Sequence, residues 1–145
     1  MPVDPKRESW KPGMPWEKAL DDMDYVKEIA KELGGEERVK RHHSGGRYTI
    51  RERIDKMLDP GSFLEAGPMV GAAEFDDDGN LTEFTPGAFV MGLGEIEGRS
   101  VAIGGDDFTI SGGSPHNVSK GPRQFTIPLS IQYGIPYIHL VEGVG

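Results

Sequence analysis

The spacing of apolar residues predicts two helices in the first half of the chain. Apolar side chains recur at steps of three and four over residues 16–33, which is the pattern of an amphipathic helix. A glycine pair follows at once and predicts the end of that helix. A shorter helix is expected after Thr49, because Thr49 and Glu52 have the spacing of a capping box.

Three stretches lack such periodicity and are expected to be irregular. Residues 1–15 are polar and contain four prolines, so they predict an extended arm. Residues 36–47 are rich in charged residues and predict a linker. The preceding helix and this linker are expected to form one region over 16–47. Residues 72–87, with an acidic run and a Pro-Gly pair, predict an exposed loop.

From residue 88 onward the pattern becomes that of strands. Apolar runs at 89–96 and 101–103 flank a Glu-Gly turn and predict a hairpin, and residues 107–110 suggest a further strand. Residues 135–141 are almost continuously apolar, as is typical of a strand buried on both faces of a mixed or parallel sheet.

The segment 122–133 fits two patterns. Its apolar residues match helical spacing, yet they also alternate as in a strand, and a proline lies in the interior. A connection between two parallel strands needs a crossover, usually a helix, so a helix is expected here.

Composition and charge narrow the class of protein. The chain has 145 residues, enough for one domain, and a net charge of -8, which argues against non-specific nucleic-acid binding. It contains no cysteine, so disulfides and thiolate catalysis are excluded. Residues 1–13 have no apolar core, so they are not expected to act as a signal peptide, and no apolar run approaches the length of a membrane span. A soluble, cytoplasmic protein is expected.

Several polar clusters could be catalytic or metal-binding sites, but a structural role is expected for each. The acidic run Asp76–Asn80 lacks the ligand spacing of an EF-hand loop. The adjacent His42 and His43 are expected on a wet surface. The acidic pair Asp106-Asp107 is expected to be a turn feature. The remaining histidines, at 116 and 139, have no serine or cysteine partner at a recognisable spacing.

Two glycine clusters, each following a predicted strand, are the candidates for a binding site. They comprise Gly112, Gly113 and Ser114 in one case, and Gly143, Val144 and Gly145 in the other. On one sheet they can face a common crevice, where backbone N–H groups can bind a phosphate or an oxyanion. Glycine pairs also end strands with no further role, and the sequence lacks the P-loop spacing.

The stretch RYTIRERIDKMLDPGSFLEAG is the first of three motifs that follow one another along the chain. It resembles the charged helix at the start of the carboxyltransferase subunits of biotin-dependent acyl-CoA carboxylases. FVMGLGEIEGRSVAIGGDDFTISGGS and GIPYIHLVEGVG resemble two later motifs of the family, at matching spacing. The resemblance covers about residues 40–145 and extends to the propionyl-, methylcrotonyl- and acetyl-CoA enzymes.

This resemblance implies a crotonase-like α/β fold, in which a twisted mixed sheet is flanked by helices. It also implies transfer of a carboxyl group from carboxybiotin to the α-carbon of an acyl-CoA. Backbone amides would stabilise the enolate, and no bound metal is needed. The partners implied are a biotin carboxylase or biotin carrier subunit and further copies of the chain, with no nucleic acid and no membrane.

The same resemblance implies the site residues. The backbone amides of Val144 and Gly145 would form the oxyanion site, although the family's Asp-Ser-Gly-Gly reads Glu-Gly-Val-Gly here. The loop of Gly112, Gly113 and Ser114 would line the coenzyme A channel. The cations suggested for the phosphates are Arg47, Arg51 and Lys120.

By the same comparison, residues 48–145 would be the start of a longer carboxyltransferase domain. The chain is therefore expected to be an N-terminal part with an incomplete first half of the fold, and to have little activity alone. Two alternatives stay open at this stage. One is a biotin-dependent acyl-CoA decarboxylase subunit, and the other is a non-catalytic fragment that binds partner subunits through an exposed apolar face on the helix at 16–33.

Overall fold

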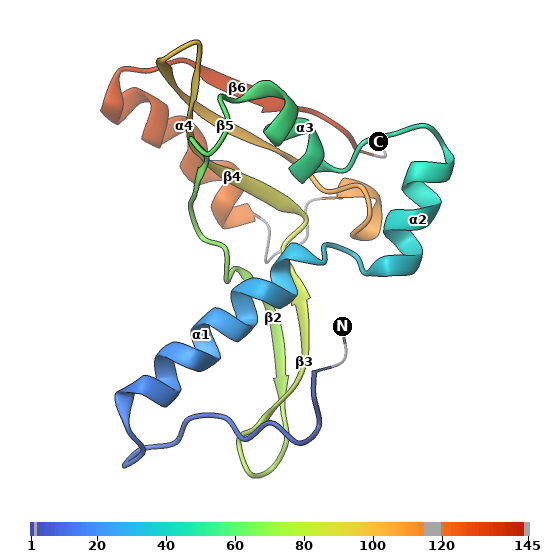
Figure 1. Ribbon diagram of the computed structural model, residues 1–145, viewed down its shortest axis with the longest axis vertical. Coiled ribbons are helices and arrows are strands. Elements are labelled where there is room, and N and C mark those ends of the chain that lie inside the picture. The colour runs from blue at the N-terminus through green and yellow to red at the C-terminus, as the bar shows by residue number, and fades with distance from the viewer. Residues whose placement is uncertain (2, 115–119, 144–145) are drawn as a thin grey trace.

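A four-stranded mixed sheet forms the centre of the larger part of the molecule. The computed structural model describes residues 1, 3–114 and 120–143 (Figure 1). The strand order is β1-β4-β5-β6, and only β5 and β6 run parallel. The strands are β1 (Leu64–Glu65), β4 (Phe89–Ile96), β5 (Arg99–Asp106) and β6 (Tyr137–Leu140).

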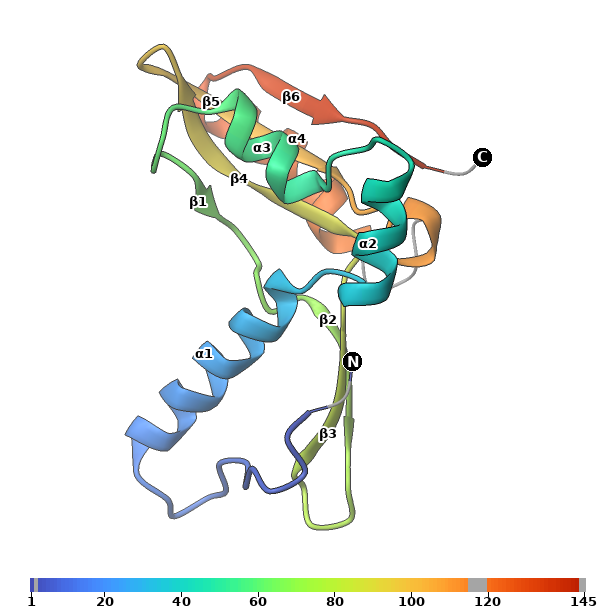
Figure 2. The same cartoon turned by 45° about the vertical axis from the view of Figure 1, so that its right-hand side comes forward.

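Helices α3 (Ile50–Met57) and α4 (Lys120–Tyr133) cover opposite faces of this sheet (Figure 2). Alternate strand residues point to opposite faces. On one face Ile50 and Ile54, each 1% exposed, pack with Ile103. On the other face the buried Thr126 of α4 places its hydroxyl 3.0 Å from the sulfur of Met91. The result is a three-layer α/β arrangement.

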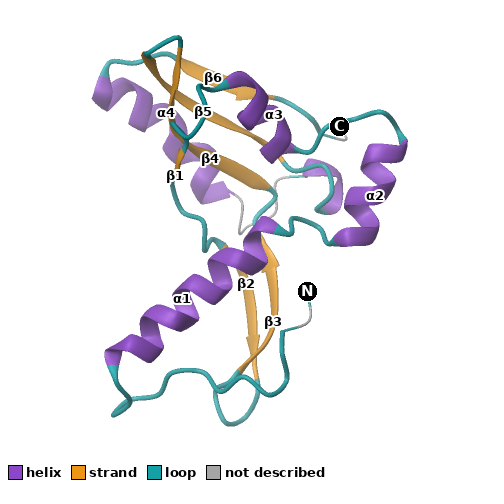
Figure 3. Ribbon diagram, in the orientation of Figure 1, coloured by secondary structure: helices purple, strands orange, loops and turns teal. Residues whose placement is uncertain are grey.

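A second, smaller core joins the N-terminal arm, helix α1 (Trp16–Lys31) and the hairpin of β2 (Gly71–Phe75) and β3 (Leu81–Pro86) (Figure 3). It contains Val3, Ile29, Ala30 and Phe84. The arm is tied to β3, because the Val3 N–H donates to the Thr82 carbonyl and the Phe84 N–H donates to the Met1 carbonyl. The predicted helix is thus confirmed over Trp16–Lys31, and Ile29 and Ala30 near its C-terminal end are buried.

The expected charged linker is wrong over most of its length, because residues 36–44 form helix α2 (Glu36–Ser44). The first turn carries Glu36 and Glu37, and the last turn carries Arg41 and two histidines. This distribution complements the helix dipole at both ends. The helix was not predicted because its sequence is strongly polar and lacks an apolar periodicity.

The loop expected over 72–87 is also wrong, because the segment forms the β2–β3 hairpin. Its acidic run makes the turn, in which the Asp76 carboxylate accepts a hydrogen bond from the backbone N–H of Asn80 at 2.7 Å. The strand expected at 107–110 is a turn instead, since β5 ends at Asp106.

The helix expected over 122–133 is confirmed as α4, with Pro128 inside it. The strand expected over 135–141 is confirmed as β6, but its burial on both faces is wrong. β6 lies at the edge of the sheet, where Leu140 is buried and Val141, just beyond it, is 67% exposed. Within the described residues, the strand is therefore less buried than its apolar sequence predicts.

The capping box predicted at the start of the second helix is present in full at α3. The Thr49 side chain accepts a hydrogen bond from the Glu52 N–H, and the Glu52 carboxylate accepts one from the Thr49 N–H at 2.7 Å. This local signal fixes where α3 begins, and so where Ile50 and Ile54 meet the sheet.

We therefore expect Thr49→Ala to lower the free energy of unfolding by about 1 kcal/mol, because it removes the acceptor for an otherwise unpaired helix N–H. Chemical denaturation monitored by circular dichroism measures the change. Thr82→Ala, at an exposed position in β3, is the control and should change stability by less than about 0.5 kcal/mol. Equal losses in the two variants would contradict a role for the cap.

Candidate functional site

A glycine-containing turn lies a few residues after the end of β5. Residues Ser111–Gly113 form a single 3-10 turn, in which Gly112 and Gly113 have φ of 65° and 73°. These angles lie in the left-handed region, which favours glycine. Gly113 is buried in this turn, whereas Gly112 stays partly exposed.

The end of β6 lies against this glycine turn. Because β5 and β6 are parallel, their carboxyl ends emerge at the same edge of the sheet. A Cβ atom added to Gly113 would overlap the carbonyl oxygen of Glu142 and lie 3.3 Å from the Cα of Gly143. The two glycine clusters predicted to share a crevice are therefore neighbours, as far as their residues are described.

An arginine-rich pocket of about 300 Å³ opens beside the turn. Its lining combines the glycine turn with α2 and the segment that follows it, and consists of Arg38, Arg41, His42, Arg47, Phe108, Thr109, Ser111 and Gly112. Within the described residues, neither Arg38 nor Arg41 has an ion-pair partner. The pocket thus offers cationic side chains to an anionic ligand.

Arg47 is held in place within this pocket. Its guanidinium carbon lies 4.5 Å from the centroid of the Phe108 ring, a cation–π contact. The same guanidinium approaches the carboxylate of Glu142 at 3.6 Å. Glu142 also pairs with Arg53 at 3.3 Å, so one carboxylate faces two guanidinium groups. The net charge of these three side chains is therefore positive.

His42 is buried, which contradicts the wet surface expected for both adjacent histidines. Only 3% of His42 is exposed; its Nε2 lies 3.0 Å from the Tyr48 carbonyl and its ring packs against Phe108. In a helix, neighbouring residues point about 100° apart. His43 accordingly lies on the outer side of α2, where it pairs with Glu52 at 2.9 Å.

Both residues of the acidic pair are buried, and only Asp107 belongs to the expected turn, because Asp106 is the last residue of β5. Asp106 is 2% exposed, pairs with Arg123 of α4 and accepts a hydrogen bond from the Glu142 N–H at 3.3 Å. Its Oδ2 lies 3.6 Å from Nε2 of His139, which places that histidine in the same cluster.

Asp107 fixes the turn that leads to the glycines. Its Oδ1 accepts hydrogen bonds from the Thr109 N–H at 2.9 Å and from the Thr109 hydroxyl at 2.6 Å. The Thr109 hydroxyl oxygen in turn accepts from the Gly34 N–H. Burial raises the pKa of the Asp107 carboxyl above its ordinary value, although these hydrogen bonds to Thr109 act in the opposite direction.

The predicted cations fall in different places. Arg47 lines the pocket, whereas Arg51 lies outside its lining and makes a bidentate pair with Glu65, with both distances 2.8 Å. The side chain of Lys120, the histidine at 116, and both Val144 and Gly145 lie outside the described residues. The sequence reasoning missed Arg38 and Arg41, which share one face of α2 at a spacing of three residues.

The described part of the chain offers neither a metal site nor a membrane-spanning helix. No group of three or more histidine or acidic side chains there could hold a metal ion. No helix in that part is both long and apolar enough to cross a membrane. The glycine turn with the arginine-rich pocket beside it is therefore the candidate site.

Comparison with known proteins agrees with this geometry. Residues 41–145 match the family model of the carboxyl transferase domain. The chain is 40% identical over 118 residues to the 3-methylcrotonyl-CoA carboxylase beta1 subunit of Mycobacterium tuberculosis, an alignment that covers 78% of this chain and 21% of that protein. It is 41% identical over 114 residues to the mitochondrial propionyl-CoA carboxylase beta chain of Sus scrofa, covering 77% and 21%. The chain thus spans about a fifth of the length of these relatives.

Solved structures give the same fold. A transcarboxylase 12S structure with methylmalonyl-CoA bound superposes with a TM-score of 0.76 at 28% identity, covering 92% of this chain and 26% of that one. The beta subunit of geranyl-CoA carboxylase from P. aeruginosa superposes at 0.69 over the whole chain and 28% of its own, with 17% identity, a likeness of fold alone. The expected fold class and family resemblance are both confirmed.

We expect Gly113→Ala to destabilise the protein more than Gly98→Ala does. The two glycines have nearly the same φ, 73° and 71°, but only at Gly113 would the new methyl group overlap another atom, the Glu142 carbonyl oxygen. The left-handed conformation alone costs about 1–2 kcal/mol for alanine. The overlap should add about 1–3 kcal/mol to the loss in Gly113→Ala. Urea denaturation of both variants tests this, and equal losses would contradict the close approach of the two strand ends.

The raised pKa of Asp107 predicts a pH-dependent stability difference for Asp107→Asn. Because the folded state disfavours the charged form, ionisation of Asp107 lowers stability as the pH rises above the ordinary aspartate pKa. Asparagine keeps an oxygen acceptor for Thr109 and removes that ionisation. The stability of the variant relative to wild type should therefore improve as the pH rises from about 3.5 to 7. A difference that stays flat, or that worsens with pH, would contradict the assignment.

Proposed function

The chain belongs to the carboxyl transferase domain family, and from this premise we propose that it forms the acyl-CoA side of a biotin-dependent carboxyltransferase site. The family includes the beta subunits of biotin-dependent acyl-CoA carboxylases. The observation that carries the proposal is the arginine-rich pocket that opens beside the glycine turn at the end of β5.

In this proposal the pocket holds the phosphates of coenzyme A. Guanidinium groups bind phosphate oxygens through charge-assisted, often bidentate hydrogen bonds. Arg38 and Arg41 are supplied by α2 and Arg47 by the segment after it, while Gly112 leaves room for the ligand against the backbone. Lys120 is retained as a further phosphate contact, and Gly113 and Ser114 as lining of the channel. Arg51 is assigned instead to holding α3 against β1 through Glu65.

The chemistry proposed is stabilisation of an enolate by backbone donors. Removal of the α-proton places negative charge on the thioester oxygen, and preorganised N–H groups in a water-poor site stabilise that charge. We assign these donors to the backbone of Val144 and Gly145, which follow the described Gly143. The contact between the Gly113 backbone and Glu142 supports this, because it fixes the peptide from which those residues continue.

The carboxyl group would arrive as carboxybiotin on a partner carrier subunit, so no residue of this chain is assigned to hold biotin. Assembly into an oligomer and a cytoplasmic location belong to the same proposal. The transcarboxylase 12S relative is described as a hexamer with its substrate bound to a multienzyme core.

The test is the affinity of the 145-residue chain for coenzyme A, measured by isothermal titration calorimetry. We expect Arg41→Gln and Arg47→Gln each to raise the Kd about ten- to a hundredfold, because each removes a charge-assisted contact to phosphate worth about 1.5–3 kcal/mol. The affinity should also fall as the salt concentration rises, and pantetheine, which lacks the phosphates, should bind much more weakly.

Arg99→Gln is the matched control, since Arg99 is an exposed arginine at the start of β5 and lies outside the pocket lining. Its Kd should equal that of wild type. The proposal fails if coenzyme A does not bind, if the three variants lose affinity equally, or if pantetheine binds as tightly as coenzyme A.

A further inference from the structure

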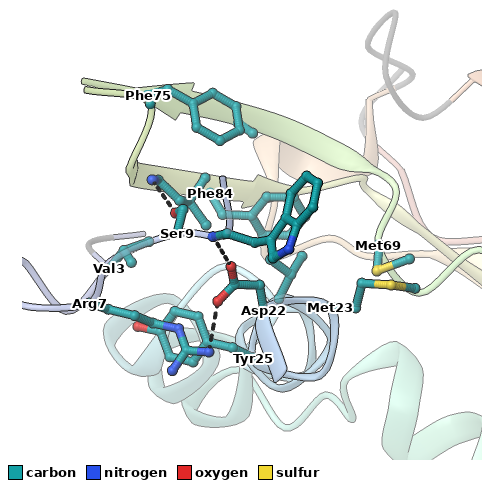
Figure 4. A pocket seen from close by; sticks show the side chains of 14 residues that line it. Val3, Arg7, Ser9, Asp22, Met23, Tyr25, Met69, Phe75 and Phe84 are labelled. Atoms are coloured by element: carbon teal, nitrogen blue, oxygen red, sulfur yellow. Dashed lines mark hydrogen bonds and ion pairs between the residues drawn. The ribbon is translucent and has the colours of Figure 1, made fainter. Parts of the chain in front are cut away.

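A second pocket, of about 330 Å³, lies in the smaller part of the molecule between α1 and the β2–β3 hairpin (Figure 4). Its volume is at the lower end of the range for ligand pockets, about 300–1,000 Å³. The walls are apolar and include Trp10, Met23, Met69, Phe75, Leu81 and Phe84. In Figure 4 the thioethers of Met23 and Met69 lie at one edge of the pocket, with Phe75 across from them.

The pocket is open to partners because its lining includes large exposed apolar side chains. Phe75 is 60% exposed, Met23 is 40% exposed and Met69 is 38% exposed. On α1, Trp16 and Leu20 extend this apolar surface at 74% and 58% exposure. Contiguous apolar surface of this kind marks a binding site, and methionine adapts to irregular partners. Leu33, expected to share the exposed face of the helix, is buried instead.

The polar groups of the pocket are already bound to one another. Arg7 pairs with Asp22 at 3.0 Å, and the Trp10 N–H donates to the same carboxylate at 2.6 Å. Ser9 bridges to the hairpin, since its N–H donates to Asn80 and its hydroxyl oxygen accepts from the Leu81 N–H. These bonds connect the arm to α1 and to the hairpin. The pocket is therefore preformed, and its occupant must be mainly apolar.

The surroundings of the pocket are strongly acidic. The elements that form it, residues 1–33 and 69–86, hold 13 acidic and 6 basic residues, which gives -7 of the chain's net charge of -8. Along α1 and the arm the basic side chains are largely taken up in ion pairs. On the hairpin, Glu74, Asp77 and Asp78 have no ion-pair partner within the described residues. These uncompensated carboxylates flank Phe75 at the end of the pocket.

We propose that this cleft binds a basic amphipathic segment of a partner polypeptide. A large apolar side chain of that segment sits between Met23, Met69 and Phe75, while lysine or arginine residues beside it face the hairpin carboxylates. This matches the helix-in-groove mode of recognition, in which apolar anchors give affinity and complementary charge gives specificity. A second copy of this chain is disfavoured as occupant, because two surfaces of net charge -7 would repel.

The test uses the 145-residue chain and a fluorescent synthetic amphipathic helix composed of leucine and lysine, titrated by fluorescence anisotropy. Two probes of matched length are compared with it, one with glutamate in place of lysine and one with serine in place of leucine. We expect the leucine–lysine probe to bind, with a Kd that rises with salt, and both other probes to bind at least about tenfold more weakly.

Variants then place the binding in the cleft. Phe75→Ala and Met69→Ala remove exposed parts of its wall and should each raise the Kd at least about tenfold, as expected for an interface anchor. Ile131→Ala is the matched control, because Ile131 is 74% exposed on α4, outside the cleft lining, and its Kd should be unchanged. Asp77→Asn with Asp78→Asn should weaken binding and flatten its salt dependence, whereas Glu95→Gln near the end of β4 together with Glu97→Gln in the β4–β5 turn should do neither.

Several results would overturn the proposal, and none of them depends on coenzyme A binding. Equal binding of the serine–lysine probe would mean that charge alone suffices. Binding of the glutamate probe, or a Kd that Phe75→Ala leaves unchanged, would remove the cleft as the site. A concentration-dependent dimer in sedimentation velocity that Phe75→Ala abolishes would assign the cleft to a second copy instead.

Discussion

The buried carboxylate of Asp106 connects the ends of β5, α4 and β6 next to the candidate site. It lies at the end of β5, pairs with Arg123 of α4 and accepts the N–H of Glu142 just beyond β6. A charge that is 2% exposed is tolerated only when paired and hydrogen-bonded. Removing one partner would leave the carboxylate uncompensated. The ends of two parallel strands and of the helix that joins them are therefore held at one place.

Glu142 also connects Asp106 to Arg47, in the segment between α2 and α3, and to Arg53 of α3. Its backbone binds Asp106, while its side chain faces Arg47 and Arg53. The segment between α2 and α3 is thus bound to the end of β6 by charge, because few apolar side chains are present there to hold it. Arg47 and Arg53 would otherwise repel one another. One carboxylate lets them lie close together, while Arg38 and Arg41 of the pocket lining stay positively charged.

The sequence predicted the elements whose signals are local or follow from topology. The capping box at Thr49 and Glu52 is read from two residues, and α4 follows from the need for a crossover between parallel strands. Helix α2 and the β2–β3 hairpin were missed because charged or turn-forming residues dominate both segments. For the site, the glycine turn and Arg47 were predicted. Arg38 and Arg41 could not be, because their shared face exists only once α2 is a helix.

The uneven distribution of charge explains how an acidic chain can contain an anion-binding site. Its net charge of -8 argues against binding to polyanions, but that charge is not spread evenly. Residues 34–68 and 87–145 hold 11 acidic and 10 basic residues, a net charge of only -1, and they contain every arginine of the pocket beside the glycine turn. The arm, α1 and the hairpin carry the remaining -7. Because surface charges are screened over about 8 Å at physiological salt, each part of the molecule presents its own charge to a ligand. A positive pocket at the end of the sheet and an acidic, apolar cleft beside α1 can therefore serve different ligands without one cancelling the other.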